Sequence, residues 1–256
     1  PARARALIVA VGGPQSMGAE RLQLQRVAAT TWAALAPDVI THVAVDTAQS
    51  EAPTPSLPRI VCPGNVMGTP FAETLFTFAA KEAKASGARF AGYSNGDIAF
   101  DSSMIDVLKA VAKAIDGNRI SKRVLLVGKR LNIYDAVEDA RQLESLAAEG
   151  DPATLRDRIR AALIDFSHRE TNYWMSQNSE DFFFFTPETF DDWDDMPNFV
   201  IGRVGWDSWL VQWAIDSGVD VVDVTKYLHV SHLTGEDGTY APVSSLPSSA
   251  WVLLSG

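Results

Sequence analysis

The sequence predicts an α/β protein with a mostly parallel central sheet and helices on both faces. The first observation is that short apolar runs at 4–11, 39–46 and 59–62 alternate with segments of helical spacing. The second is that this alternation continues through 88–100 and 122–130, the order typical of parallel strands joined by helices. The third is the run DFFFF (181–185), whose lack of polar alternation is typical of a strand buried on both faces.

The individual elements follow from local signals. Residues 19–35 carry apolar side chains at helical spacing, and 70–87 has proline at its first turn and glycine after its end. The helix over 102–115 opens on a serine, which we expect to cap it. The remaining predicted elements are two short helices within 137–164 that break at 150–152, a helix over 205–218 and a strand over 219–225.

We expect a single domain over 1–256, since neither a repeat nor a convincing linker interrupts the chain. The single cysteine, Cys62, excludes an internal disulfide, favours a reducing compartment and is expected to pack at a strand end.

Charge and hydropathy exclude several classes of partner. A net charge of −10 without a stripe of Lys or Arg argues against nucleic acid. The sequence contains no apolar run near the ~20 residues of a membrane span, so we expect no transmembrane segment. We expect a cytoplasmic protein, whether free, peripheral to a membrane or part of a longer chain. The segment 179–199 holds seven carboxylates, most of which we expect in a solvated acidic loop.

Ligands of open α/β sheets bind at the carboxyl ends of the strands, which singles out the polar residues there. The polar candidates are Asp46, Asn65, Asn95, Lys129 and Arg130, and the loop that follows the first strand adds Val11 and Gly12 as predicted ligand-binding positions. A dinucleotide site is disfavoured because VGGPQSMG (11–18) does not fit G-x-G-x-x-G and Asp46 lies too far beyond it. The chain has no phosphate-binding G-x-x-x-x-G-K-[ST] loop and neither an HExxH nor a G-x-S-x-G motif.

Asn95 and Asp97 form the sharpest local feature, because both follow an apolar strand and offer oxygens one residue apart. Such a pair is able to bind a hard divalent cation that bridges two phosphates, and His232 would complete the coordination from late in the chain. The alternative is an Asx turn in which Asp97 caps the following residues.

Taken together, several blocks resemble a family of GT-A-fold glycosyltransferases. SNGDI (94–98) is similar to the family's Asn-Ala-Asp-Ile element, and MPNFVIGRVGWDSWL (196–210) is similar to its P-x-F-x-I-G-R-x-x-W-D-N-W-L block. RVAATTWAALAP (26–37) and MGTPFAETLF (67–76) extend the resemblance over roughly residues 20–235. The chain departs from the family at Gly96, at Ser208 and at its histidine pair, so the metal histidine is His232 or His229; spacing favours His232.

The resemblance implies a GT-A-like, Rossmann-like domain that transfers sugar from a nucleotide-diphosphate donor to a glycan or lipid-linked glycan. Its first half, 1–130, would bind the nucleotide sugar, and its second half, 131–256, would face the acceptor. Asp207 would be the general base at the start of a helix, with Trp206 and Trp209 as apolar walls and an inverting outcome. Asp97 and His232 would hold Mn²⁺ or Mg²⁺ against the diphosphate. Lys129, Arg130 and Arg203 would add positive charge near the diphosphate. Asp46 would contact the base or ribose of the nucleotide. A polysaccharide biosynthesis role is consistent with this reading.

Other functional classes stay open at this stage. A non-catalytic domain of the same fold would bind a glycan or nucleotide without turnover, although intact acids at 97 and 207 argue against it. A nucleotide-dependent oxidoreductase is disfavoured by the glycine mismatch. A sugar-nucleotide pyrophosphorylase would carry basic residues in the glycine-rich loop after the first strand, and 11–18 has none.

Overall fold

The computed structural model describes residues 6–11, 19–45, 57–62, 70–133, 136–149, 152–170, 172–174, 180–202 and 205–233. Four of the predicted site residues, Gly12, Asp46, Asn65 and Arg203, lie outside this described part. Among the described helices, none is long and apolar enough to cross a membrane.

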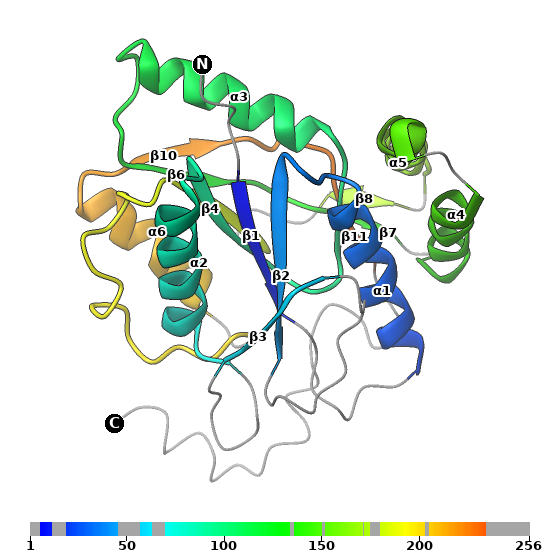
Figure 1. Ribbon diagram of the computed structural model, residues 1–256, viewed down its shortest axis with the longest axis horizontal. Helices are drawn as coiled ribbons and strands as arrows, with labels where there is room; N and C mark the ends of the chain where they lie inside the picture. Colours follow the sequence, from blue (N-terminus) through cyan, green and yellow to red (C-terminus); the bar gives the residue numbers. More distant parts are fainter. Residues whose placement is uncertain are drawn as a thin grey trace, which may run out of the picture.

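The largest sheet has seven strands and confirms the predicted α/β architecture (Figure 1). Its order is β10-β6-β9-β4-β1-β2-β3, so the first four strands follow the 3-2-1-4 order of doubly wound folds. All neighbouring pairs are parallel except those of β9, which runs antiparallel between β4 and β6. The strands are β1 (Ala6–Val11), β2 (Val39–Val45), β3 (Arg59–Val61), β4 (Phe90–Ser94), β6 (Val124–Val127), β9 (Phe182–Phe185) and β10 (Asp220–Asp223).

Helices cover both faces of this sheet, as predicted. The helices are α1 (Ala19–Ala33), α2 (Ala72–Ser86), α3 (Ser103–Asp116), α4 (Ala136–Glu149), α5 (Pro152–Ser167) and α6 (Trp206–Asp216). Side chains of α1, α3, α4 and α5 share one core with Phe182 and Phe184, and those of α2 and α6 share the other with Phe183 and Phe185. Successive side chains of β9 therefore enter opposite cores, because a strand alternates its faces.

All four phenylalanines of β9 are fully buried, which confirms the predicted two-sided burial. The sheet takes strands from both sides of residue 130, so the two predicted halves contribute to one layer. Cys62 follows β3, where it is buried, and burial raises the pKa of its thiol to about 11. Its packing at a strand end is thus as expected.

Some predicted boundaries were wrong. Pro70 does not begin the helix of the 70–87 segment, because α2 starts at Ala72 and Phe71 forms an isolated bridge with Val200. The predicted end is correct: Gly87 has a φ of 68° and closes α2 in the left-handed conformation that glycine adopts without strain.

A second sheet of four strands lies beside the first, in the order β5-β11-β7-β8. Its strands are β5 (Ile98–Phe100), β7 (Leu131–Ile133), β8 (Tyr173–Trp174) and β11 (Val230–Leu233). Antiparallel pairing of β11 with β5 places His232 opposite Ile98, and the Leu233 amide donates to the Asp97 carbonyl at 3.0 Å. The fold thereby brings a residue from late in the chain beside the β4–β5 connection.

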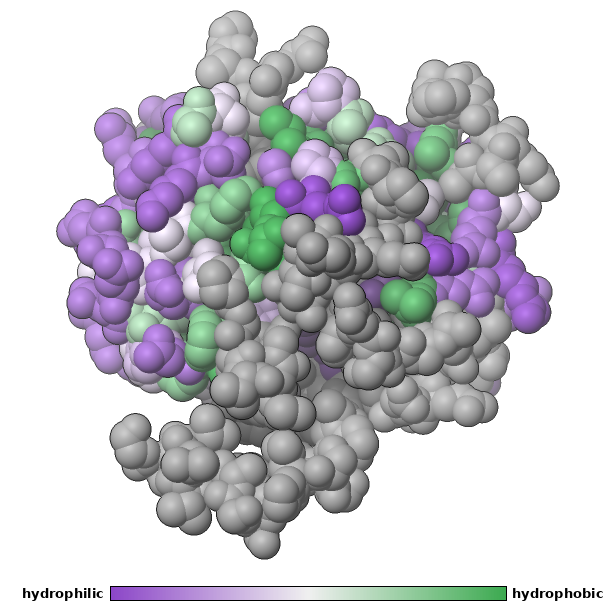
Figure 2. Space-filling model, turned by 60° about the horizontal axis from the view of Figure 1, so that its bottom comes forward, coloured by the Kyte–Doolittle hydropathy of each residue, from purple (hydrophilic) through white to green (hydrophobic). Residues whose placement is uncertain are grey.

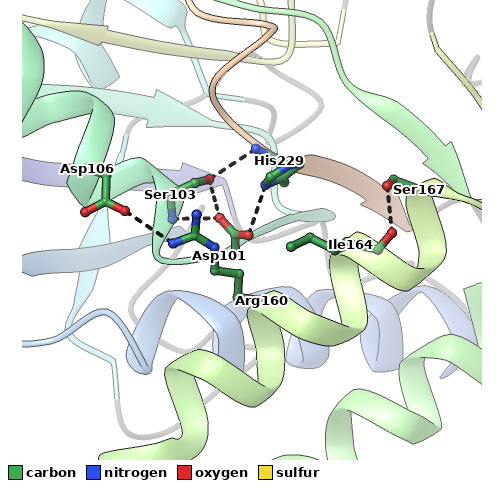
Figure 3. A network of polar contacts seen from close by, with 7 residues as sticks. All are labelled: Asp101, Ser103, Asp106, Arg160, Ile164, Ser167 and His229. Atoms are coloured by element: carbon green, nitrogen blue, oxygen red, sulfur yellow. Dashed lines mark hydrogen bonds and ion pairs between the residues drawn. The ribbon is translucent and has the colours of Figure 1, made fainter.

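Asp101, and not the predicted Ser102, caps helix α3. Ser102 makes no capping bond through its side chain, whereas Asp101 Oδ1 accepts from the Ser103 amide at 2.8 Å and from the Ser103 hydroxyl. The buried Asp101 carboxylate also faces His229 Nδ1 at 3.3 Å, as Figure 3 shows. His229 thus joins β11 to the start of α3 at the far end of β5.

We predict that Gly92→Ala destabilises the protein by about 1–3 kcal/mol, the usual cost of overpacking a core. A Cβ at Gly92 would lie 2.6 Å from the ring of Phe184 and 3.0 Å from the Phe183 carbonyl, both fixed in the sheet. Urea denaturation is the measurement. Gly117→Ala is the control, because its Cβ would meet nothing nearer than 3.3 Å. Equal midpoints for the two variants would contradict the expected crowding.

Candidate functional site

The described candidates gather at the carboxyl edge of the parallel strands. Asn95 and Asp97 follow β4, Lys129 and Arg130 follow β6, and Asp207 opens α6. Figure 2 views the molecule from the side toward which β1 and β2 run, where hydrophilic residues make up most of the described surface. Val11 ends β1 at the same edge.

Asp97 and His232 are in direct contact, with 3.2 Å between Asp97 Oδ2 and His232 Nε2. Their side chains are 21% and 7% exposed, so the pair is largely shielded from solvent. Two atoms that bind one cation at right angles with bonds of about 2.1 Å lie about 3 Å apart, so the spacing fits neighbouring ligands. His229, the other candidate, faces Asp101 instead.

The described residues contain no group of three or more His, Cys, Asp or Glu that could hold a metal by itself. Mg²⁺ sites, however, commonly use one or two carboxylates and complete their coordination with substrate phosphates and water. Asp97 offers one carboxylate of this kind, and His232 would add an imidazole nitrogen beside it.

Both ends of the Asn95 amide are engaged in the protein. Its Oδ1 accepts from the Tyr93 hydroxyl at 2.5 Å, and its Nδ2 donates to Asp181 Oδ1 at 2.8 Å. The backbone amide of Asn95 also donates to the Asp181 carbonyl at 2.9 Å. These contacts fix the end of β4 against the start of β9, and so hold the peptide that leads to Asp97.

Asp181 is a site residue that the sequence analysis missed. It is 6% exposed and forms a buried ion pair with Arg130, whose Nε donates to Asn132 Oδ1 at 3.1 Å. Burial raises the pKa of the Asp181 carboxyl; Arg130 and His232 oppose this rise, and Asp97 and Asp207 add to it. Arg130 is thus held inside the protein by Asp181.

The expected acidic loop over 179–199 is therefore only partly correct. Five of its seven carboxylates are exposed: Glu188, Asp191, Asp192, Asp194 and Asp195. Asp181 is buried and Glu180 half-buried, because they precede a strand that enters the core on both faces. The sequence did contain a signal for this burial, because Asp181 directly precedes a run of four phenylalanines.

Asp207 lies half-buried in the first turn of α6, where its Oδ1 accepts from the Ser208 amide at 2.8 Å. The preceding Gly205 has a φ of 97°, a conformation that favours glycine and turns the chain into the helix.

The two tryptophans do not frame Asp207 as expected. Trp206 is 5% exposed and packs edge-on against Tyr93, with 5.4 Å between ring centroids. Trp209 is partly buried against Phe199 and lies about 160° around the helix from Asp207. A helix turns its side chains by about 100° per residue, so neighbours in sequence diverge. Trp206 instead supports the Tyr93–Asn95 contact from behind.

Lys129 and Glu180 are two further charged residues at this edge. The Lys129 amide donates to Thr225 Oγ1 at 2.9 Å, which anchors the end of β6 to the β10–β11 connection. Burial, and then the charge of Asp207, raise the pKa of Glu180 to about 7, while Lys129 opposes the shift. Burial also raises the pKa of Tyr93, reinforced by Asp181, Asp97 and Asp207. The charges of all three aspartates thus act on the same buried phenol.

No protein-family model matches the chain, and no curated protein sequence matches it. Solved structures similar to it include a putative nucleotide-diphospho-sugar transferase from Desulfovibrio desulfuricans G20, with 10% identity, a TM-score of 0.46, and coverage of 86% of this chain and 79% of the other. A CMP:2-keto-3-deoxy-manno-octonic acid synthetase in complex with CTP is 12% identical, with a TM-score of 0.44 and 98% coverage of both chains.

A third similar structure is mannose-1-phosphate geranyltransferase from Thermus thermophilus. It is 13% identical, with a TM-score of 0.35 and coverage of 90% of this chain and 73% of the other. All three TM-scores are below 0.5, and similarity at this level does not indicate a shared activity. The function of this protein is therefore inferred from its own residues.

Proposed function

We propose that this protein is a metal-dependent glycosyltransferase that moves a sugar from a nucleotide-diphosphate donor to a hydroxyl of a glycan or lipid-linked glycan. The observation that carries the proposal is the link between the start of α6, which carries Asp207, and the end of β4. Trp206 packs against Tyr93, and the Tyr93 hydroxyl donates to Asn95, two residues before Asp97. Both Asp97 and Asp207 influence the ionisation of Asp181 and Tyr93, which supports one shared site. A transferase needs this combination of a phosphate-binding side and a proton-accepting side.

The donor side is formed by Asp97 and His232, which would hold Mn²⁺ or Mg²⁺. When bound, such a cation neutralises the negative charge that develops on the leaving diphosphate. Lys129 adds a positive charge at the same edge. Asn95 contributes by positioning, since its amide is held between Tyr93 and Asp181. Gly12, Asp46, Asn65 and Arg203 stay predicted donor contacts.

On the acceptor side, Asp207 removes the proton of the acceptor hydroxyl. That oxygen forms a bond to the anomeric carbon, and the bond from the same carbon to the diphosphate breaks. The diphosphate leaves with the electron pair. Attack from the side opposite the leaving group inverts the anomeric configuration. Asp207 suits this role because it lies in the first turn of α6 and is only half-buried, so that a substrate can contact it.

Thermal unfolding against a panel of nucleoside diphosphates and nucleotide sugars, each with Mn²⁺, Mg²⁺ or EDTA, tests the donor side. A ligand at about a hundred times its Kd stabilises by roughly 2.7 kcal/mol, which corresponds to a rise of several degrees in Tm. We expect one nucleotide class to raise Tm with metal present, and EDTA to abolish the rise. Asp97→Asn is expected to abolish the metal-dependent part.

Asp191→Asn is the matched control, because Asp191 is an exposed carboxylate of the acidic segment. It is expected to keep the full shift. If no nucleotide in the panel raised Tm, with or without metal, the proposed donor site would be contradicted. A metal-dependent shift without sugar transfer to any glycan acceptor would instead indicate a binding domain.

A further inference from the structure

A polar cluster fixes the chain just before strand β11, which carries His232. Asp101 follows β5 with its carboxylate buried, and Ser103 is the first residue of α3. The His229 amide donates to Ser103 Oγ at 3.2 Å, and His229 Nδ1 lies 3.3 Å from Asp101 Oδ2 (Figure 3). We call Asp101, Ser103 and His229 the β11 clasp.

The members of the β11 clasp are held by one another. Asp101 Oδ1 accepts from the Ser103 hydroxyl, and from the Ser103 amide at 2.8 Å. Among the described residues, neither Asp101 Oδ2 nor His229 Nδ1 makes a hydrogen bond to another group. A buried carboxylate oxygen without a polar partner is costly, so the contact with Nδ1 holds His229 in place. The start of β11 is thereby tied to the start of α3.

The β11 clasp lies at one end of a short strand pairing whose other end is the proposed metal site. The antiparallel pairs between β5 and β11 are Phe100 with Val230, Ala99 with Ser231, and Ile98 with His232. The pairing of β11 with β7 on its other side is equally short. Beyond these pairs, the Leu233 amide donates to the Asp97 carbonyl at 3.0 Å, and His232 Nε2 lies 3.2 Å from Asp97 Oδ2. A slip of one residue would turn His232 to the opposite face of the sheet, away from Asp97.

We propose that Asp101, Ser103 and His229 are positioning residues of the metal site, which hold β11 in the register that places His232 beside Asp97. This inference rests on the proposed metal-binding role of Asp97 and His232. It gives the two histidines of HVSH (229–232) different tasks. His232 contacts the cation, and His229 fixes the strand that carries His232.

His229→Leu is expected to weaken Mn²⁺ binding by about 10–100-fold, the usual effect of losing a residue that orients a metal ligand. Titration of Mn²⁺ alone with the protein, followed by electron paramagnetic resonance of the free ion, measures the Kd. The conservative variant His229→Asn is expected to restore most of the affinity, because its amide nitrogen can donate to Asp101 in place of Nδ1. Ser103→Ala, which removes a single hydroxyl from the clasp, is expected to weaken binding in the same direction.

Two control variants separate positioning from general stability. Asp106→Asn removes an exposed ion pair with Arg160 on the same helix α3 and is expected to leave the Mn²⁺ affinity unchanged. Arg156→Met removes an ion pair with Asp38 near the end of α1, so it is expected to lower stability without changing the Mn²⁺ affinity. Mn²⁺ binding by His229→Leu that is as tight as that of Arg156→Met would overturn the proposal.

A second measurement does not involve metal. Hydrogen exchange of the Leu233 amide reports whether β11 stays in register, because this amide donates to the Asp97 carbonyl. We expect this exchange to be faster in His229→Leu than in Arg156→Met, and to slow again in His229→Asn. An unchanged exchange rate in His229→Leu would show that the clasp does not set the register. If the wild type did not bind Mn²⁺, the proposed metal site and the positioning role would both be wrong, whereas faster Leu233 exchange in His229→Leu would still establish the clasp as the device that sets the register.

Discussion

Asp207→Asn is expected to lower kcat by about 10²–10⁴-fold, the usual contribution of a positioned general base. The amide cannot take up the acceptor's proton, but its Oδ1 is still able to accept from the Ser208 amide as Asp207 does at 2.8 Å. The helix start and the Trp206–Tyr93 contact stay in place, so the fold and donor binding should be kept. Steady-state transfer with donor and acceptor varied separately is the measurement.

The matched control for this variant is Asp216→Asn at the other end of α6. Asp216 Oδ1 accepts from Gln212 Nε2 at 2.8 Å on the exposed side of the helix, so its loss should leave kcat unchanged. The proposed role of Asp207 would be wrong if kcat in Asp207→Asn stayed within about twofold of the wild type, far below the usual contribution of a base. A fall in kcat with an unchanged donor-induced Tm shift would separate the base from the donor site.

Arg130→Met is expected to destabilise the protein by about 3–5 kcal/mol, the usual cost of removing one partner of a buried ion pair. Arg130 is 4% exposed, and its loss leaves the Asp181 carboxylate in the interior without its cation. Desolvation already raises the pKa of Asp181, and Arg130 opposes that rise. The variant should therefore lose less stability at low pH, where Asp181 is protonated, than at pH 8.

Urea denaturation at pH 5 and pH 8 measures this effect. The double variant Arg130→Met with Asp181→Leu should recover part of the loss, because apolar pairs often replace buried ion pairs without penalty. Arg141→Met is the control: its pair with Glu138 is 64% and 77% exposed, and such pairs contribute at most about 1 kcal/mol. Similar losses for Arg130→Met and Arg141→Met would show that the buried pair is not important for stability.

Much of the architecture could be predicted because it depends on local patterns. Apolar runs separated by helical segments indicated the parallel sheet, and the unbroken DFFFF run indicated the central strand β9. The position of Asn95 and Asp97 could also be predicted, since residues that follow a parallel strand lie at the carboxyl edge of the sheet. Helices and strands with regular spacing, and the residues that follow each strand, can therefore be predicted from the sequence.

Whether each acid is buried or exposed could not be predicted from such local patterns. Asp181 and Glu180 stand in a segment rich in carboxylates, and composition alone favoured solvent for most of it. Their burial follows from the antiparallel insertion of β9 between β4 and β6, a pairing between distant segments. Arg130 was likewise predicted as a donor contact, and its ion pair with Asp181 depends on that same insertion.

The sequence by itself determined which segments form strands and helices, and which polar residues follow the strands, because these features depend on periodicity over a few residues. Only the tertiary structure decided that His232 lies against Asp97, that Trp206 packs behind Tyr93, and that Glu180 comes under the influence of Asp207. The physical reason is that burial and charge contacts arise where distant strands pair, and these pairings leave no periodic trace in the chain.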